Sequence, residues 1–218
     1  MSVLKLEHIT YRYKKADKAV LKDVNCQFKS GEIAAVIGPS GSGKTTLLSI
    51  LAGLDEPALG SITKDGEDIL KMDGDLWRRR EVSVIFQSFH LFPMLTVLEN
   101  VMFPLELNGI PKKEAARKAR ENLTLVGLEP EKYRRFPSNL SGGEQQRVAI
   151  ARSLSSGAGI LLADEPTGNL DTSNTDNIID ILVRLAHQEN YCIILVTHDM
   201  NLLDRMDAVY RMQDGKLL

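Results

Sequence analysis

The chain has 218 residues, of which 43% are hydrophobic and 26% are charged, as expected for a folded protein with a substantial core. Its 27 Lys and Arg residues are balanced by 29 Asp and Glu residues, and the net charge of −2 argues against a nucleic-acid-binding protein, which usually has a basic surplus. The longest apolar runs are too short to cross a bilayer, and residues 1–13 are typical of a strand and not of a signal peptide, so we expect a soluble cytoplasmic protein.

The N-terminal part of the chain predicts strands followed by a helix. Polar and apolar residues alternate over most of the first thirty residues, which predicts an antiparallel pair of strands joined by a polar loop over 14–18. Residues 33–38 have no polar face, so we expect a strand that is buried on both sides. A helical pattern follows over 44–54 and ends near Gly53.

The rest of the chain indicates an α/β fold. Three more buried strands are expected at 82–87, 159–164 and 192–197. Helical patterns occupy 96–107, 111–126, 142–155 and 172–189. An Asp214–Gly215 turn predicts a C-terminal hairpin. Apolar strands that alternate with helices predict a mainly parallel sheet.

The sequence predicts one domain over residues 1–218. Residues 88–156 carry helical patterns and no convincing strand, so we expect a helical subdomain inserted into the connections of the sheet. The core and an N-terminal antiparallel β subdomain would then occupy about 1–87 and 157–218.

A glycine-rich segment between a buried strand and a helix fits the pattern G-x-x-x-x-G-K-[ST]. It comprises Gly38, Pro39, Ser40, Gly41, Ser42, Gly43, Lys44, Thr45 and Thr46. The glycines at 41 and 43 let backbone N–H groups turn toward a phosphate, and Lys44 places its charge on the β- and γ-phosphates. The hydroxyl of Thr45 can bind Mg²⁺, and that of Thr46 can reach the α-phosphate. The segment predicts a P-loop NTPase core of the RecA-like type.

Two acidic residues close the apolar run at 160–164. Asp164 stands at the end of the strand, where it can hold Mg²⁺ through water, and Glu165 follows directly. A carboxylate shielded from bulk water beside the γ-phosphate is suited to act as general base for an attacking water. The two motifs together predict hydrolysis of a nucleoside triphosphate.

A second glycine-rich helix start, L-S-G-G-E-Q-Q-R, lies at 140–147. Ser141, Gly142 and Gly143 would offer a hydroxyl and free backbone N–H groups to a phosphate. With this octapeptide the chain resembles, over essentially its whole length, the nucleotide-binding subunit of ABC (ATP-binding cassette) transporters. The resemblance implies bound ATP and Mg²⁺, and a homodimer in which residues 141–143 of one chain cover the ATP held by its partner.

The resemblance also implies roles for four further residues. Tyr13 is similar to the aromatic residue that stacks on adenine, with Tyr11 as the alternative. Gln87 resembles the glutamine that contacts Mg²⁺ and senses the helical subdomain. Asp171 resembles the aspartate of the loop after the acidic pair, and His198 the histidine that holds the γ-phosphate and the attacking water.

The resemblance implies that an integral membrane permease is the partner and holds the chain at the inner face of the cell membrane. The sequence D-E-P-T-G-N-L-D is similar to the branch that serves lipoprotein-release, macrolide-efflux, cell-division and antimicrobial-peptide-resistance systems, many of which transmit motion across the bilayer. Residues 88–96 are rich in apolar side chains and are expected to lie on the surface and to contribute to the permease contact. The alternative for each of these side chains is packing in the core of the helical subdomain.

Two alternatives to a transport motor stay open at this point. The first is a regulatory module that closes on ATP and hydrolyses it slowly. The second is an ABC ATPase that acts on DNA or ribosomes, which is disfavoured because such proteins usually carry long coiled coils or two tandem cassettes.

Overall fold

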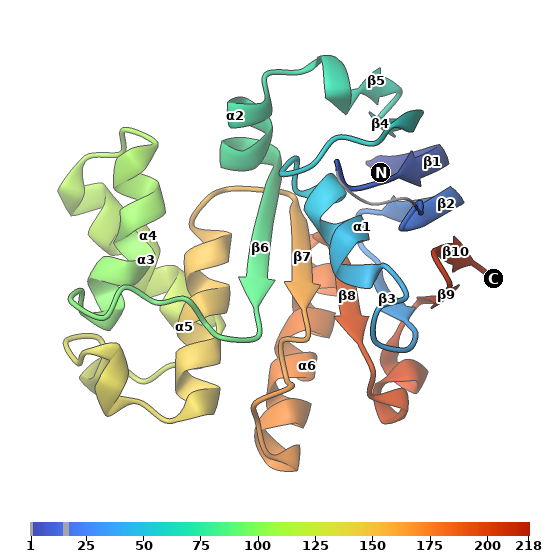
Figure 1. The fold of residues 1–218 in the computed structure, drawn as a ribbon. Helices are drawn as coiled ribbons and strands as arrows, with labels where there is room; N and C mark the ends of the chain where they lie inside the picture. The colour runs from blue at the N-terminus through green and yellow to red at the C-terminus, as the bar shows by residue number, and fades with distance from the viewer. Residues whose placement is uncertain (1, 15–17) are drawn as a thin grey trace.

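The computed structural model describes residues 2–14 and 18–218, and most of the predicted loop over 14–18 therefore lies outside the described residues. Figure 1 shows a central sheet with a smaller sheet beside it and a group of helices on the opposite side. The larger sheet has six strands in the order β10-β9-β3-β8-β7-β6, and the smaller one has four in the order β2-β1-β4-β5.

The larger sheet is mainly parallel, as predicted. Its strands are β3 (Ile33–Ile37), β6 (Val82–Phe86), β7 (Ile160–Asp164), β8 (Cys192–Thr197), β9 (Ala208–Gln213) and β10 (Lys216–Leu217). Strands β6, β7, β8, β3 and β9 run parallel, whereas β10 folds back antiparallel onto β9 and confirms the C-terminal hairpin. Ile37 is in register with Thr197, and Asp164 with Val196, so three strands end together at one edge of the sheet.

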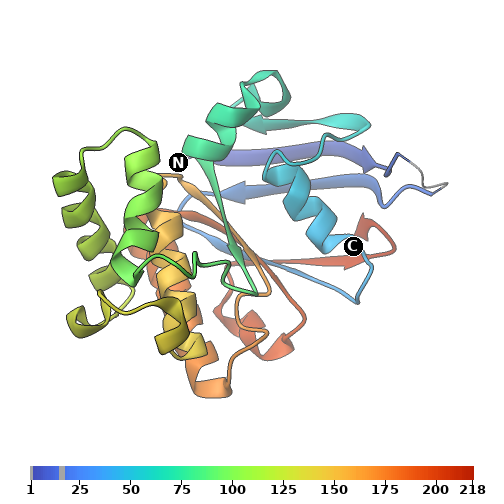
Figure 2. The ribbon, with the colours of Figure 1, turned by 60° about the vertical axis from the view of Figure 1, so that its left-hand side comes forward.

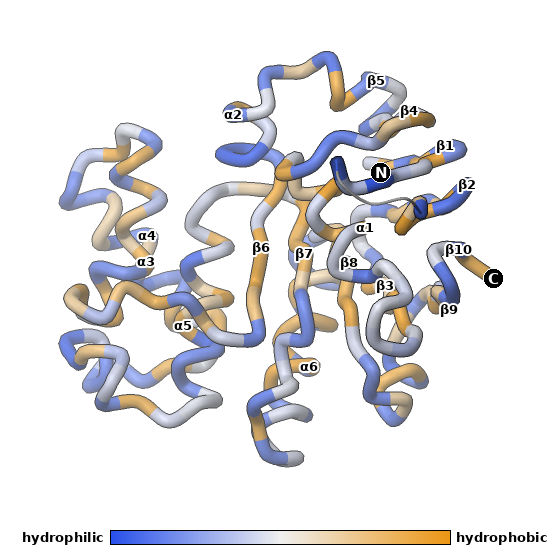
Figure 3. The backbone as a smooth tube through the Cα atoms, viewed as in Figure 1, coloured by the Kyte–Doolittle hydropathy of each residue, from blue (hydrophilic) through white to orange (hydrophobic). Residues whose placement is uncertain are grey.

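The two faces of this sheet belong to two hydrophobic cores. Along β8, Ile193 and Leu195 pack with α6 (Thr172–Glu189) and the helical segment, whereas Ile194 and Val196 pack with α1 (Lys44–Leu51) and the smaller sheet. Because strand side chains alternate between faces, a strand covered on both sides must be apolar throughout. Figure 3 shows this as long hydrophobic stretches along β7 and β8.

One strand differs from its prediction. Residues 82–87 were expected to form a buried strand, but within β6 only Val82 and Ile85 are buried. The physical reason is position, because β6 is the edge strand of the sheet and pairs only with β7. Its apolar sequence reflects contact with helices and not burial between two neighbouring strands.

The smaller sheet confirms the predicted antiparallel pair and adds two strands that were not predicted. Its members are β1 (Val3–Tyr11), β2 (Leu21–Lys29), β4 (Leu59–Lys64) and β5 (Glu67–Asp68). In β4 only Ile62 is buried, so the apolar alternation that marks a strand is weak there. Gly60 weakens it further, and a Cβ at this position would lie 2.5 Å from the carbonyl oxygen of Glu7 and 2.6 Å from that of His8.

The segment from 88 to 156 is helical, as predicted, and all of its residues are described. Its main helices are α3 (Val97–Leu107), α4 (Lys112–Leu125) and α5 (Gly142–Leu154), with short 3₁₀ turns at Pro130–Lys132 and Pro137–Asn139. In Figures 1 and 2 these helices lie on the far side of β6 and β7 from α1. The exact limits of a helical subdomain within the single domain stay a prediction.

The remaining short elements connect the sheets. A turn of helix, α2 (Gly74–Leu76), continues into a π-helical turn at Trp77–Glu81 before β6, and a 3₁₀ helix at Met200–Arg205 follows β8. Within the described residues, no helix has the length and apolar character needed to cross a bilayer.

Candidate functional site

The loop between β3 and α1 has the backbone of a phosphate-binding loop. Gly41 and Gly43 have φ angles of 77° and 107°, a region that side chains with a Cβ disfavour. A Cβ at Gly43 would lie 2.8 Å from a Leu21 methyl group, whereas one at Gly41 would meet open space. Gly43 is therefore required by packing against β2, and Gly41 lies at the open mouth of the loop.

Lys44 begins α1 and is enclosed by the loop. Its side chain folds back so that Nζ donates hydrogen bonds to the carbonyl oxygens of Gly38 and Pro39, at 2.8 and 2.9 Å. The residue is only 7% exposed, and a buried ammonium group with two neutral acceptors is well placed for an anionic ligand. The buried hydroxyl of Ser42 has no hydrogen-bond partner within the described residues. Both features fit a bound phosphate group.

A pocket of about 330 Å³ opens above this loop. It is lined by Tyr13, Val20, Ser40, Gly41, Gly43, Lys44, Thr45, Thr46 and Glu165. The side chain of Tyr13 is 47% exposed, and its hydroxyl lies 3.1 Å from the Thr46 hydroxyl. Tyr11 is buried and donates to the Asp55 carboxylate at 2.8 Å. The structure therefore places Tyr13 at the pocket and Tyr11 in the core.

The acidic pair lies at the end of β7, beside this loop. Burial raises the pKa of the Asp164 carboxyl above its ordinary value, and the charge of Glu165 adds to the rise. Lys44 and a hydrogen bond from Thr45 offset part of this effect. A nearby cation would stabilise the charged form of this buried carboxylate. Asp164 and Thr45 therefore form an oxygen-donor pair suited to a hard cation.

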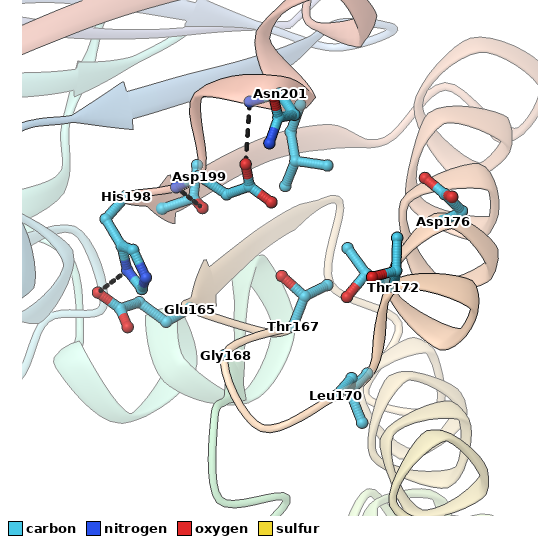
Figure 4. Close-up of a pocket in the computed structure, with 12 residues that line it drawn as sticks. Glu165, Thr167, Gly168, Leu170, Thr172, Asp176, His198, Asp199 and Asn201 are labelled. Carbon is cyan, nitrogen blue, oxygen red and sulfur yellow. Dashed lines mark hydrogen bonds and ion pairs between the residues drawn. The ribbon is translucent and has the colours of Figure 1, made fainter.

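Glu165 and His198 face each other across the ends of β7 and β8. Nδ1 of His198 lies 3.2 Å from Oε1 of Glu165, and Figure 4 shows the two side chains directed toward one another. Glu165 has a positive φ of 46°, a strained conformation of the kind that functional sites hold. Its N–H donates to the Val196 carbonyl at 3.0 Å, which fixes the turn against β8.

A second pocket, of about 310 Å³, lies on the other side of Glu165. Thr167, Thr172 and Thr197 are among the residues that line it, together with Asp176 and Asp199 (Figure 4). Glu165 lines both pockets, so it connects the phosphate loop with a polar pocket that is large enough for several waters. This arrangement allows Glu165 to accept a proton from a water directed at a bound phosphate.

Gln87 is paired with a residue that sequence reasoning missed. Its Nε2 donates to Oδ1 of Asn169 at 3.3 Å, and Asn169 Nδ2 returns a bond to the Gln87 carbonyl oxygen at 3.2 Å. Gly168 has no Cβ, and one added there would lie 2.6 Å from Gln87 Nε2. The sequence signal for this contact was G-N-L-D, after the acidic pair, because a glycine next to Asn169 leaves room for the Gln87 side chain.

The second glycine-rich helix start lies apart from the phosphate loop. Ser141 is the N-cap of α5, and Gly142 and Gly143 follow it. Figures 1 and 2 place α5 on the far side of β6 and β7 from α1. A Cβ at Gly143 would lie 2.2 Å from Oδ1 of Asn174 on α6, so this glycine is needed for helix packing as well.

Asp171 acts here as the N-cap of α6. Its carboxylate accepts hydrogen bonds from the backbone and side chain of Asn174, which lower the pKa of Asp171 below its ordinary value. Within one chain the structure thus gathers Tyr13, residues 38–46, the acidic pair and His198 into one site. The residues at 141–143 and Asp171 lie outside it.

Comparison with known proteins gives the family. A model of the ABC transporter family matches residues 21–168. LolD 1, the ATP-binding protein of the lipoprotein-releasing system of Rhodopirellula baltica, is 43% identical over 203 residues, covering 92% of this chain and 88% of that protein.

Solved structures agree with this match. A dimeric structure of the bacterial ABC transporter cassette MJ0796 has a TM-score of 0.87 and 37% identity, and covers 98% of this chain and 96% of the cassette. A second structure shows the same cassette as a post-hydrolysis dimer bound to ADP and phosphate, at 36% identity with the same TM-score of 0.87. CbiO1 of Clostridium perfringens, part of the transporter complex CbiONQ, has a TM-score of 0.90 and 30% identity, covering 99% of this chain and 86% of that one.

The predicted fold class, a P-loop core with an antiparallel β subdomain and a helical subdomain, is therefore confirmed. Because the family model and the relatives span most of the sequence, the chain belongs to the ABC transporter family, as an ATP-binding subunit that hydrolyses ATP to ADP and phosphate.

Proposed function

We propose that two copies of this chain close head to tail around two ATP molecules and that this closure drives a membrane permease. The proposal depends on one observation: the two phosphate-binding helix starts, those of α1 and α5, lie on opposite sides of β6 and β7. One chain covers the ATP pocket on one side only, and its second helix start, at 141–143, faces elsewhere. The dimeric structures of the related cassette MJ0796 support this arrangement.

The free donors at the second helix start fit a phosphate. Within residues 2–14 and 18–218, the backbone N–H groups of Gly142 and Gly143 have no acceptor. In the dimer, these two donors and the Ser141 hydroxyl would bind the γ-phosphate held by the partner. Each charge-assisted hydrogen bond would contribute about 1.5–3 kcal/mol, and all are lost when the γ-phosphate leaves. Hydrolysis would therefore open the dimer.

In the proposed mechanism, each site residue has a distinct role. Lys44 and the N–H groups of residues 41–46 hold the β- and γ-phosphates, and Tyr13 stacks on the base. Glu165 accepts the proton of the attacking water, while His198 orients that water and the γ-phosphate. Gln87 is proposed to report the state of this site to the helical segment through its pairing with Asn169.

Mg²⁺ is the metal that the donor set fits. Within the described residues, no cluster of three or more His, Cys, Asp or Glu side chains could hold a metal by itself. The hydroxyl of Thr45 and the carboxylate of Asp164 would share the ion with the nucleotide phosphates, with Gln87 as a further ligand. When bound, Mg²⁺ neutralises charge that develops on the transferred phosphate.

The subtype proposed is the mechanotransmitting branch that serves lipoprotein release, efflux or peptide resistance. The 43% identity to the lipoprotein-releasing LolD 1 and the sequence D-E-P-T-G-N-L-D support it. CbiO1 belongs to the complex CbiONQ, and a multi-subunit complex is also proposed for this chain. The permease would hold it at the cytoplasmic face of the cell membrane.

ATP turnover is expected to depend on protein concentration, and this is the direct test of the two-chain site. Because each site needs two chains, turnover per chain should rise with concentration and level off once dimers form. The measurement is phosphate release across about a hundredfold range of subunit concentration, well above and below the dimer dissociation constant. Turnover per chain that is constant at every concentration would contradict the proposal.

Residues 88–96, the predicted permease contact, differ in how far their side chains are exposed. Phe92 and Met94 are exposed, Met94 by 84%, whereas Leu91 packs against the core of the helical segment. For Leu91 this favours the alternative reading of the segment, that the side chain packs in the core of the helical segment. The exposed side chains continue onto α3, where the ring of Phe103 packs at a tilt against that of Phe92, with ring centres 4.8 Å apart, and lines a groove of about 250 Å³.

Phe103→Ser is expected to weaken permease binding without unfolding the subunit, because Phe103 is exposed on this groove. Leu91→Ser is the matched contrast, and should destabilise the subunit by about 0.5–3 kcal/mol since it removes a half-buried, packed side chain. The measurements are the amount of membrane protein that co-purifies with the tagged chain and the thermal midpoint of the isolated subunit. If Phe103→Ser lowers the midpoint as much as Leu91→Ser, the groove is only part of the core.

A further inference from the structure

The carboxylate of Glu144 at the start of α5 has two opposite effects. It caps the helix, but its negative charge would repel a phosphate bound there. Glu144 occupies the third position of the helix and forms a capping box with Ser141. Its Oε2 accepts the Ser141 N–H at 2.7 Å, and its own N–H is directed at Ser141 Oγ at 3.4 Å. Two of the four free N–H groups at this helix start are satisfied in this way.

The capping box determines which groups stay available. The N–H groups of Gly142 and Gly143 keep no acceptor within the described part of the chain. Ser141 Oγ accepts from the Glu144 N–H, and the Ser141 hydroxyl also hydrogen-bonds to the Glu144 carboxylate. The capping box therefore leaves two backbone donors, those of Gly142 and Gly143, without an acceptor among the described residues, and this arrangement depends on the Glu144 carboxylate staying where it is.

The same carboxylate brings a negative charge within one helical turn of those donors. A phosphate approaching Gly142 and Gly143 would meet the positive end of the helix and, beside it, the charge of Glu144. An uncompensated carboxylate here would oppose anion binding. Any role of this helix start in binding phosphate thus requires that the charge of Glu144 be neutralised.

Lys132 supplies that neutralisation from a separate element. It ends the 3₁₀ turn Pro130–Lys132, and its Nζ lies 2.5 Å from Oε1 of Glu144. The side chains of Lys132 and Glu144 are only 21% and 15% exposed, so solvent screens this pair less than a surface pair. Glu129 is a second partner of Lys132, at 3.1 Å.

The two pKa shifts agree with this geometry. Burial alone would raise the pKa of Glu144, but the hydrogen bonds from Lys132 and from Ser141 outweigh it and lower the pKa below its ordinary value. The pKa of Lys132 is raised, first by Glu144 and then by Glu129. Both groups therefore stay charged and paired near neutral pH.

We propose that Lys132 is a positioning residue for ATP-driven closure: it holds and neutralises Glu144, so that Ser141, Gly142 and Gly143 can donate hydrogen bonds to the γ-phosphate of the partner's ATP. This inference rests on the proposed head-to-tail function. Lys132 itself does not touch the nucleotide, and it acts through Glu144. The role requires a positive charge at this position only as long as Glu144 is negative.

This condition can be tested by removing the two charges one at a time and together. Lys132→Met leaves an unpaired carboxylate and should raise the ATP concentration for half-maximal dimerisation roughly tenfold. Lys132→Arg should leave this ATP concentration close to that of the unmodified chain, because the guanidinium can still pair with Glu144. The double variant Lys132→Met with Glu144→Gln should also recover, to within about threefold, since Gln can still accept the Ser141 N–H without a charge. The measurement is Mg-ATP-dependent dimer formation by sedimentation.

Two controls separate the possible causes. Lys118→Met removes the lysine of an exposed ion pair with Glu114 on α4 and should leave dimerisation unchanged. Binding of a fluorescent ADP to the monomer should be equal in all variants, because the phosphate loop is untouched. If the double variant is as impaired as Lys132→Met, or if Lys132→Met behaves as the unmodified chain, the inference is overturned.

The same assay separates this inference from the proposed function. Ser141→Arg should abolish ATP-dependent dimers if the helix start binds the partner's nucleotide. If Ser141→Arg has no effect, the head-to-tail function itself is wrong and the role of Lys132 is rejected with it. If Ser141→Arg abolishes dimers and Lys132→Met does not weaken them, only the role of Lys132 is rejected.

Discussion

Glu165→Gln is expected to lower ATP turnover by about 10²–10⁴-fold while leaving ATP binding intact. The amide keeps the size and shape of the carboxylate but cannot accept the proton of the attacking water. Because the γ-phosphate then persists, the two chains should stay closed around ATP. Phosphate release measures the first effect, and size-exclusion chromatography with Mg-ATP measures the second, as a shift from monomer to stable dimer.

The control for this substitution is an equally conservative change at a carboxylate outside the site. Glu189→Gln, at the end of α6, should leave both turnover and dimerisation unchanged. Equilibrium binding of a fluorescent ATP analogue should be the same in all three proteins. A Glu165→Gln chain that hydrolyses ATP at nearly the rate of the unmodified chain would exclude this residue as the general base.

The central sheet could be predicted because its physical signals are local. A strand covered by helices on both faces must be apolar throughout, and the runs at 33–37, 160–164 and 192–197 meet that condition. The phosphate loop is equally local, since its glycines, Lys44 and Thr45 follow one another in sequence. Strands β4 and β5 could not be found this way, because one buried residue in Leu59–Lys64 leaves no clear period.

Contacts between distant segments are what the sequence alone did not reveal. The pairing of Gln87 with Asn169 joins residues 82 positions apart, and the contact of His198 with Glu165 depends on β7 and β8 being neighbours. The charge balance at α5 is similar. Glu144 lies in a recognisable motif, but its partner Lys132 lies in an irregular turn that no periodicity marks.

Mixing two inactive variants is expected to restore one working site. Lys44→Ala removes the lysine of the phosphate loop, and Ser141→Arg blocks the helix start that is proposed to act on the partner's ATP. A homodimer of either variant would carry a defect in both sites, so each variant alone should be inactive. In a heterodimer both defects fall in the same site, and the other site combines an intact Lys44 with an intact Ser141 from the two different chains.

The outcome depends on whether the second helix start acts on its own chain or on its partner. If it acts on the partner, the mixture should occlude ATP in up to about half of the sites in heterodimers, whereas the separate variants occlude none. If it acted within one chain, every site would keep a defect and mixing would restore nothing. Occluded nucleotide is a better measurement than turnover, because coupling between the two sites could suppress hydrolysis at a single intact one. Failure to occlude ATP, with both variants folded by circular dichroism and exchanging subunits, would reject the head-to-tail dimer, and with it the reason for two phosphate-binding helix starts in one chain.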